Sequence, residues 1–301
     1  MNTKRRKMKH VFAGCLLFLP GALLCSASRA PRIDSQPGKS QRETKPAFFS
    51  SIAPVQGGIP DAKETAKSES KVPPGTILPV QLNSSLSSSK SKANQAISAR
   101  IMQEVPLPGG AKIREGSQVL GFIVEVAAAK SGSPAEISFR FDRLRTAHQT
   151  IPITTNLRAI AGFMEILDAQ TPPIGPGESD VYRWLTTVQV GGDVVYGDGG
   201  IVTKANDASD VVGKSVGGGV LGQVSAKEGT ECRGPLFGNN SLQALWVFSS
   251  DACGVYGLAH LEISHAGRSD PVGLITFRSD AKHLRLPSGT GMLLRVGNLS
   301  K

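Results

Sequence analysis

Aromatic residues are scarce in this chain of 301 residues, where they make up 5% of the sequence and include two tryptophans and three tyrosines. Surfaces that bind nucleic acid combine clustered Lys and Arg with aromatic side chains that stack on bases. The formal net charge of +10 would suit such a surface, but residues 72–301 hold 21 basic and 19 acidic residues, a net charge of +2, and these are dispersed. The sequence therefore predicts no nucleic-acid partner.

Cysteine and histidine are too few and too widely spaced to indicate a metal site. The four cysteines have no CxxC spacing, and two of them lie within the first 25 residues. The other two, Cys232 and Cys253, are expected to form one disulfide in an oxidising compartment, with a zinc site as the weaker alternative. Among the histidines, His260 and His265 would point to opposite faces of one strand. The sequence predicts no metal ion and no cofactor.

The longest hydrophobic run in the chain is shorter than a typical transmembrane helix. This run, Val11–Cys25, covers fifteen residues, whereas about 20 are needed to cross a bilayer as a helix. A basic stretch precedes this run and small residues follow it, which is the pattern of a secretory signal peptide cleaved after Ala27. We therefore expect residues 1–27 to direct export to the periplasm, cell surface or exterior. An uncleaved membrane anchor is the alternative.

Residues 28–71 contain few large apolar side chains and many Ser, Lys, Pro and Gln. Such a segment cannot bury enough apolar surface to offset the entropy lost on ordering. We expect it to be a disordered linker.

From residue 72 onward, short apolar runs alternate with Gly- and Pro-rich turns, which predicts an all-β fold. In the stretch Glu136–Leu144, the side chains of Ile137, Phe139 and Phe141 alternate with polar neighbours, as in a half-buried antiparallel strand. We expect residues 72–170 to form a small β-barrel or sandwich. Its expected strands are Ile77–Leu82, Ala96–Val105, Gln118–Ala127, Glu136–Leu144 and Thr150–Thr155.

Glycine dominates the middle of the chain, with ten glycines in Gly191–Gly222 alone. We therefore expect residues 171–225 to be a Gly/Pro-rich loop region that contains one short helix, Glu178–Thr187.

Strand patterns return in residues 226–301, a second β region that carries the expected disulfide. We expect Trp246 and Phe248 to pack beside that disulfide. The sequence leaves open whether the two β regions form one domain or two. The expected strands are Ala244–Phe248, Val255–Ile263, Val272–Phe277 and Met292–Val296.

One enzymatic motif needs to be weighed. Gly213–Gly217 matches the G-x-S-x-G pattern of a nucleophile elbow centred on Ser215. The elbow requires a strand that passes directly into a helix, and the glycines at 217, 218 and 219 each cost a helix about 1 kcal/mol relative to Ala. We predict no catalytic residue, and a serine hydrolase that uses Ser215 is an alternative. Its partners would come from Asp251, Asp270, His265 and His283.

Several segments together resemble a known family. They are Val72–Leu82, Ser87-Ser88, Ile97–Ile101, Gly116–Gly121 and Arg140–Leu144. This pattern, with its P-x-G-T turn and G-x-x-x-x-G segment, resembles the β-barrel of VirB10/TrbI-type secretion and conjugation proteins. The resemblance implies a barrel fold and a place in the cell envelope. That family's long pore-forming helical insert has no counterpart here.

Together these features favour a non-enzymatic exported protein that acts through contacts with other envelope proteins. A component of a secretion or conjugation channel is one alternative, and the Ser215 hydrolase is the other.

Overall fold

The structure is a computed structural model that describes residues 71–170, 186–196, 200–204, 207–225, 232 and 241–298. The expected signal peptide, the expected linker except for Lys71, and most of the expected helix Glu178–Thr187 lie outside the described residues. The described part consists mainly of β-strands, so the expected all-β fold class is confirmed.

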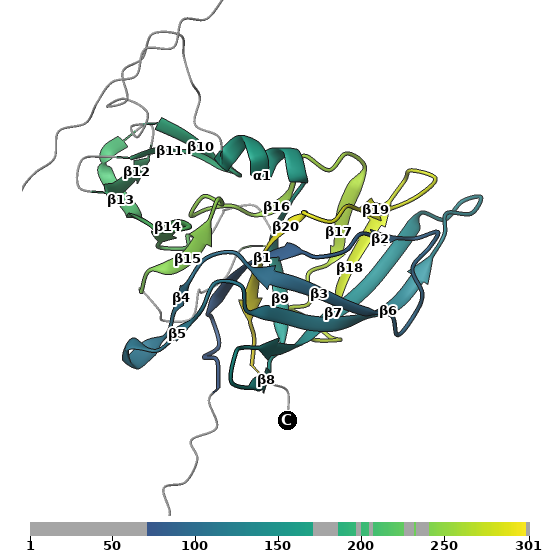
Figure 1. Cartoon of the computed structure of the whole chain (residues 1–301). Coiled ribbons are helices and arrows are strands. Elements are labelled where there is room, and N and C mark those ends of the chain that lie inside the picture. Colours follow the sequence, from purple (N-terminus) through teal and green to yellow (C-terminus); the bar gives the residue numbers. More distant parts are fainter. Residues whose placement is uncertain are drawn as a thin grey trace, which may run out of the picture. The chain divides into compact units, whose positions relative to one another are not determined.

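Ten strands form one sheet that closes almost completely into a barrel (Figure 1). All pairs are antiparallel except β16 with β9, and the two ends of the sheet, β16 and β17, contact each other. In sheet order the strands are β16 (Gly254–Tyr256), β9 (Thr155–Ala161), β20 (Gly291–Val296), β1 (Ile77–Leu82), β3 (Ala96–Ile101), β6 (Gln118–Ala127), β7 (Ala135–Arg145), β18 (Ile275–Ser279) and β17 (Leu261–His265), and β8 (Thr150–Pro152) pairs with β7.

Alternation of apolar and polar residues explains the barrel core. Ile137, Phe139 and Phe141 of β7 are almost wholly buried, as their spacing predicts. The ring of Phe139 packs 5.6 Å from that of Phe141 and 5.7 Å from that of Phe277 on β18, measured between ring centres. Such contacts place the large aromatic side chains inside the barrel.

Strands from the two expected β regions share this one sheet. β1 lies between β20 and β3, with Ile77 opposite Arg295 and Val80 opposite both Met292 and Ile101. The C-terminal strands therefore complete the barrel that the N-terminal strands begin, and the two β regions are not separate folds.

A second sheet of six antiparallel strands occupies the part of the chain that we expected to be a loop region, residues 171–225 (Figure 1). Five of its strands lie in that interval, because neighbouring hairpins satisfy the backbone even where glycine gives little side-chain packing. At Gly213 an added Cβ would lie 2.2 Å from the carbonyl oxygen of Leu221. The strands are β10 (Thr186–Gln189), β11 (Gly192–Tyr196), β12 (Ile201–Lys204), β13 (Asp207–Val216), β14 (Gly219–Gly222) and β15 (Gln243–Trp246).

Three short features complete the described fold. β2 (Leu86–Ser87) pairs with β19 (Arg285–Leu286), and β4 (Val105–Pro106) pairs with β5 (Lys112–Ile113) across the 3-10 turn Pro108–Gly110. The helix α1 (Phe163–Gln170), which the sequence analysis missed, buries Ile166.

No helix within the described ranges is both long enough and apolar enough to cross a membrane.

The barrel and the six-stranded sheet meet around a second apolar cluster. Trp246 and Phe248 lie in it with their ring centres 6.4 Å apart, packed with Ile77 and Leu293 from the barrel wall. The buried side chain of Gln103 also joins the two sheets: its Nε2 donates to the carbonyl of Val220, and its Oε1 accepts from the backbone N–H of Trp246.

Several expected strands are interrupted: Ala96–Val105 is divided between β3 and β4, and Thr150–Thr155 between β8 and the first residue of β9. Val255–Ile263 is split into β16 and β17 by a turn in which Gly257 and His260 both have positive φ, 60° and 61°. The turn lets the chain leave a parallel pairing with β9 and enter an antiparallel pairing with β18. His260 therefore lies in a turn and not on a strand face.

Candidate functional site

A groove of about 740 Å³ lies at one end of the barrel. It is lined by β5, by the following turn to the start of β6, by the β7–β8 hairpin, and by Lys71 and Val72, which lead into β1. The buried side chains of Val72, Ile113 and Ile151 supply its apolar lining. A concave site with an apolar lining and a few polar groups is the usual form of a binding site.

Cationic side chains surround this apolar base. Lys112, Arg114 and Arg145 are exposed and line the groove, as do Lys71 and the exposed His148, and Glu115 is the lone carboxylate in the lining. The ammonium group of Lys112 lies 2.9 Å from the carboxylate of Glu104, and Arg145 donates to the side-chain carbonyl of Gln118. The groove therefore carries a positive excess and would attract an anionic ligand.

Two strands beside the groove are edge strands. In the described part of the chain, β5 pairs only with β4, and β8 pairs only with β7. Edge strands present backbone N–H and C=O groups that can pair with an extended peptide. Residues of both edge strands, Lys112 and Ile113 of β5 and Ile151 of β8, line the groove.

The predicted disulfide between Cys232 and Cys253 is confirmed. Their Cα atoms lie 6.0 Å apart, and the residues are 21 positions apart in the sequence. Beside the bond, the backbone N–H of Cys253 donates to the hydroxyl of Tyr256, and that hydroxyl donates to the carbonyl of Cys253. The disulfide ties Cys232 to Cys253, the residue just before β16.

Ser215 does not lie in a nucleophile elbow. It is an exposed residue inside β13, opposite Val220 of β14, and the chain turns back into an antiparallel hairpin instead of entering a helix. Its hydroxyl makes no hydrogen bond to a histidine or carboxylate among the residues that the structure describes. The geometry that would activate this serine is absent from this hairpin.

Two of the residues proposed as its partners, Asp251 and His265, make hydrogen bonds to other groups. Asp251 accepts a hydrogen bond from the Ser249 hydroxyl at 2.7 Å. The Nδ1 of His265 accepts from the backbone N–H of Gly267, and its Nε2 lies 3.3 Å from the backbone carbonyl of Asp270. His283 is exposed beside β19.

The second histidine of the close pair has a different partner. Nδ1 of His260 lies 3.0 Å from the carboxylate of Asp280. Within the described residues, no three His, Cys, Asp or Glu side chains gather as metal ligands would.

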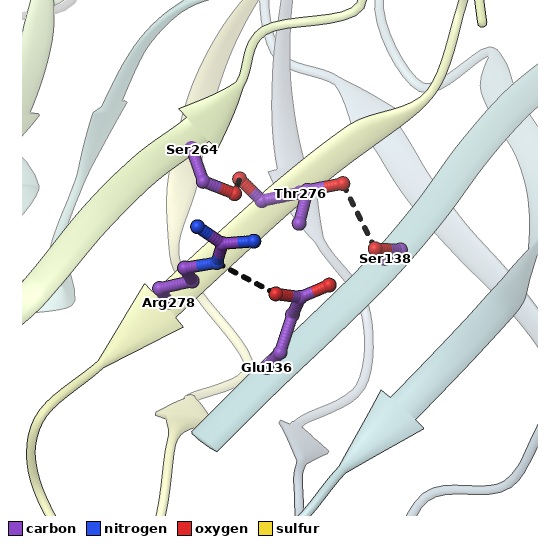
Figure 2. A network of polar contacts seen from close by, with 5 residues as sticks. All are labelled: Glu136, Ser138, Ser264, Thr276 and Arg278. Atoms are coloured by element: carbon purple, nitrogen blue, oxygen red, sulfur yellow. Dashed lines mark hydrogen bonds and ion pairs between the residues drawn. The ribbon is translucent and has the colours of Figure 1, made fainter. Parts of the chain in front are cut away.

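A polar ladder links β7 and β18, as Figure 2 shows. The Ser138 and Thr276 hydroxyls lie 2.8 Å apart, and Arg278 Nε donates to the carboxylate of Glu136 at 2.7 Å. This pairing raises the pKa of the Arg278 guanidinium. Ser264 completes the ladder by donating to the Thr276 backbone carbonyl. The ladder links neighbouring strands, and its carboxylate, Glu136, is paired with Arg278.

Sequence reasoning missed the groove because its residues come from segments that are far apart in the chain. Lys112 and Arg145 are brought to one end of the barrel by the long β6–β7 hairpin, whose register places Gln118 opposite Arg145. Two register shifts interrupt that hairpin and cancel each other, so Gln118 and Arg145 pair in the same register as Ala127 and Glu136 near its turn. In the sequence, the only indications of the groove were the turns at Pro108–Gly110 and 146–149, which lie beside its lining residues.

Comparisons with known proteins give no further identification. No protein-family model matches the chain, and no curated protein sequence matches it. The resemblance to VirB10/TrbI-type barrels therefore stays a prediction, and the chain's function is inferred from its own geometry.

Proposed function

We propose that this chain is an exported, non-enzymatic binding protein whose groove holds an extended acidic segment of an envelope protein. The observation that carries the proposal is the combination of an apolar groove base with a rim of Lys112, Arg114 and Arg145.

The positive charge of the groove rim favours an acidic peptide as its ligand. A strand that alternates acidic and apolar residues can direct apolar side chains toward Val72, Ile113 and Ile151 while its carboxylates face the cationic rim. The edge strands β5 and β8 add backbone hydrogen bonds of the kind used in strand addition. A basic peptide would instead meet like charge along the rim.

Export is supported by the Cys232–Cys253 disulfide, because disulfides persist in oxidising compartments. It is also supported by the signal-like pattern of residues 1–27. We place the protein in the periplasm or at the cell surface. A place in a secretion or conjugation channel, which the family resemblance implies, stays a prediction.

The test is a binding titration of the full chain with a fluorescent peptide of about ten residues in which Glu and Val alternate, a length that matches strand-addition ligands. A peptide in which Lys replaces Glu serves as the reverse-charge probe. We expect the Glu peptide to bind and the Lys peptide not to bind.

Charge-reversal variants locate the binding. The double variant Arg114→Glu, Arg145→Glu should weaken binding of the Glu peptide by about ten-fold or more, since rim charges steer association and oppose like charge. The double variant Lys282→Glu, Arg285→Glu makes the same change in net charge at exposed positions outside the groove, and it should bind like the unmodified chain. Equal affinities of the two variants, or no binding of the Glu peptide, would refute the proposal.

A further inference from the structure

A β-bulge places an arginine on the outside of the barrel wall. In the pairing of β9 with β20, Ala159 lies opposite Leu293 and Leu157 opposite Leu294, so Arg158 is the extra residue between them. Leu157 faces the barrel core and Ala159 joins the second apolar cluster. Bulges often redirect a side chain next to a functional site.

Arg158 is buried but incompletely bonded. It is 6% exposed, and its Nη2 donates to the carbonyls of Ser225 and Ser250. Its Nε is buried and has no hydrogen-bond partner among the described residues. A buried N–H of a charged group without an acceptor is costly, and in native proteins such a group usually has a partner in water or in a bound ion.

Two more arginines line the same small cavity. Arg268, from the exposed loop after β17, and Arg295, from β20, face it together with Asn156 and Cys232. The cavity measures about 20 Å³, which is enough for one water-sized atom or group. The carbonyl oxygen of the Asn156 side chain is also buried without a partner. A half turn of that amide would present its N–H₂ group to the cavity instead.

The positive charges of Arg158, Arg268 and Arg295 repel one another. Burial, and then repulsion from Arg295, lowers the pKa of Arg158 to about 10. Burial and repulsion from Arg268 lower the pKa of Arg295. Asp251 and Tyr256 act in the opposite direction on Arg158, but the carboxylate of Asp251 already accepts from the Ser249 hydroxyl. An anion next to the Nε–H of Arg158 would oppose the lowering of that residue's pKa.

We propose that this cavity binds an oxyanion, one oxygen of which accepts from the Nε–H of Arg158 while Arg268 and Arg295 hold the rest of the group at the mouth. Guanidinium groups suit this task, because their planar N–H donors match the oxygens of phosphate and carboxylate groups. The site lies beside the disulfide and is lined by none of the groove residues, so it is independent of the proposed peptide binding.

The direct test follows the Nε–H NMR signal of Arg158 in the full chain. That signal is identified by its loss in Arg158→Lys. Inorganic phosphate is titrated at constant ionic strength, with acetate and chloride in parallel titrations. We expect phosphate or acetate to shift the signal saturably, and the tighter of the two identifies whether the site prefers a phosphate or a carboxylate.

Two exposed arginines supply the variants. Arg268→Gln should weaken the oxyanion affinity about ten-fold, the loss expected for one charge-assisted hydrogen bond. Arg285→Gln, on β19 away from the cavity, should leave it unchanged. The proposal is overturned if neither oxyanion moves the Arg158 signal, if chloride moves it with the same affinity, or if both variants bind equally.

Discussion

At the scale of single residues, Gln103 is the side chain on which the junction between the two sheets most depends. It is fully buried, and its amide pairs with the backbone of both β14 and β15, donating at 3.1 Å to Val220 and accepting at 2.6 Å from Trp246. Neighbouring Gly219 leaves room for it, because a Cβ there would lie 2.7 Å from the Gln103 Oε1. Removing the amide would leave two buried backbone groups without partners.

We therefore expect Gln103→Ala to lower the free energy of unfolding by about 2 to 4 kcal/mol, the cost of two unsatisfied buried groups together with lost packing. Gln223→Ala, at an exposed glutamine directly after β14, should change it by less than about 0.5 kcal/mol. Urea unfolding of both variants measures the difference. Equal midpoints would show that Gln103 does not bridge the sheets.

At the scale of elements, the β6–β7 hairpin forms the longest wall of the barrel and requires a glycine at its closest approach. A Cβ on Gly121 would lie 1.9 Å from the carbonyl oxygen of Arg140, where the register of the pair shifts. Gly116, five positions earlier, has a φ of 83° in the turn before β6. The two glycines of the G-x-x-x-x-G segment therefore have separate structural reasons.

Gly121→Ala should cost more than about 3 kcal/mol of stability, because backbone atoms of both strands would have to move apart. Gly217→Ala is the matched control, since Gly217 has no atom within 4 Å of an added Cβ and no positive φ. Thermal unfolding followed by circular dichroism compares the two. A Gly121→Ala protein that is as stable as the control contradicts the described approach of β6 and β7.

The sequence predicts elements well where alternation is strong and poorly where packing is weak. Gln118–Ala127 and Ile77–Leu82 form strands with the predicted bounds, since buried and exposed side chains alternate clearly along β6 and most of β1 is buried. The hairpins of β13 and β14 are rich in glycine and carry little apolar pattern, so composition suggested a loop. The helix α1 escaped notice because its apolar Phe163 and Met164 are exposed, and only Ile166 marks a buried face.

The candidate sites could not be predicted from the sequence in the same way. The groove joins residues from β5, the start of β6 and the β7–β8 hairpin, and the arginine cavity depends on a bulge that leaves no mark in the pattern of β9. The disulfide was predictable because only two cysteines remained outside the N-terminal segment. Two remaining cysteines can be paired without knowledge of the fold. To predict a site formed by residues from distant strands, the register of those strands must be known.

At the scale of the whole molecule, the disulfide closes a stretch of the chain that links the second sheet to the barrel. Closing a loop of this length should stabilise the fold by about 3 kcal/mol, mainly by restricting the unfolded chain. We expect the double variant Cys232→Ser, Cys253→Ser to lose about that much in urea unfolding. The unmodified chain under reducing conditions should lose a similar amount. An unchanged midpoint in both cases would mean that the bond does not constrain the fold.

We propose that this β-barrel protein functions outside the cytoplasm, with its disulfide formed. The most direct measurement is mass spectrometry of the protein from its native cell fraction, reading the mature N-terminus and the state of Cys232 and Cys253 in the same sample. We predict a chain that begins near Ser28, with the two cysteines joined. An uncleaved chain in the cytoplasmic fraction with both thiols reduced would contradict the account.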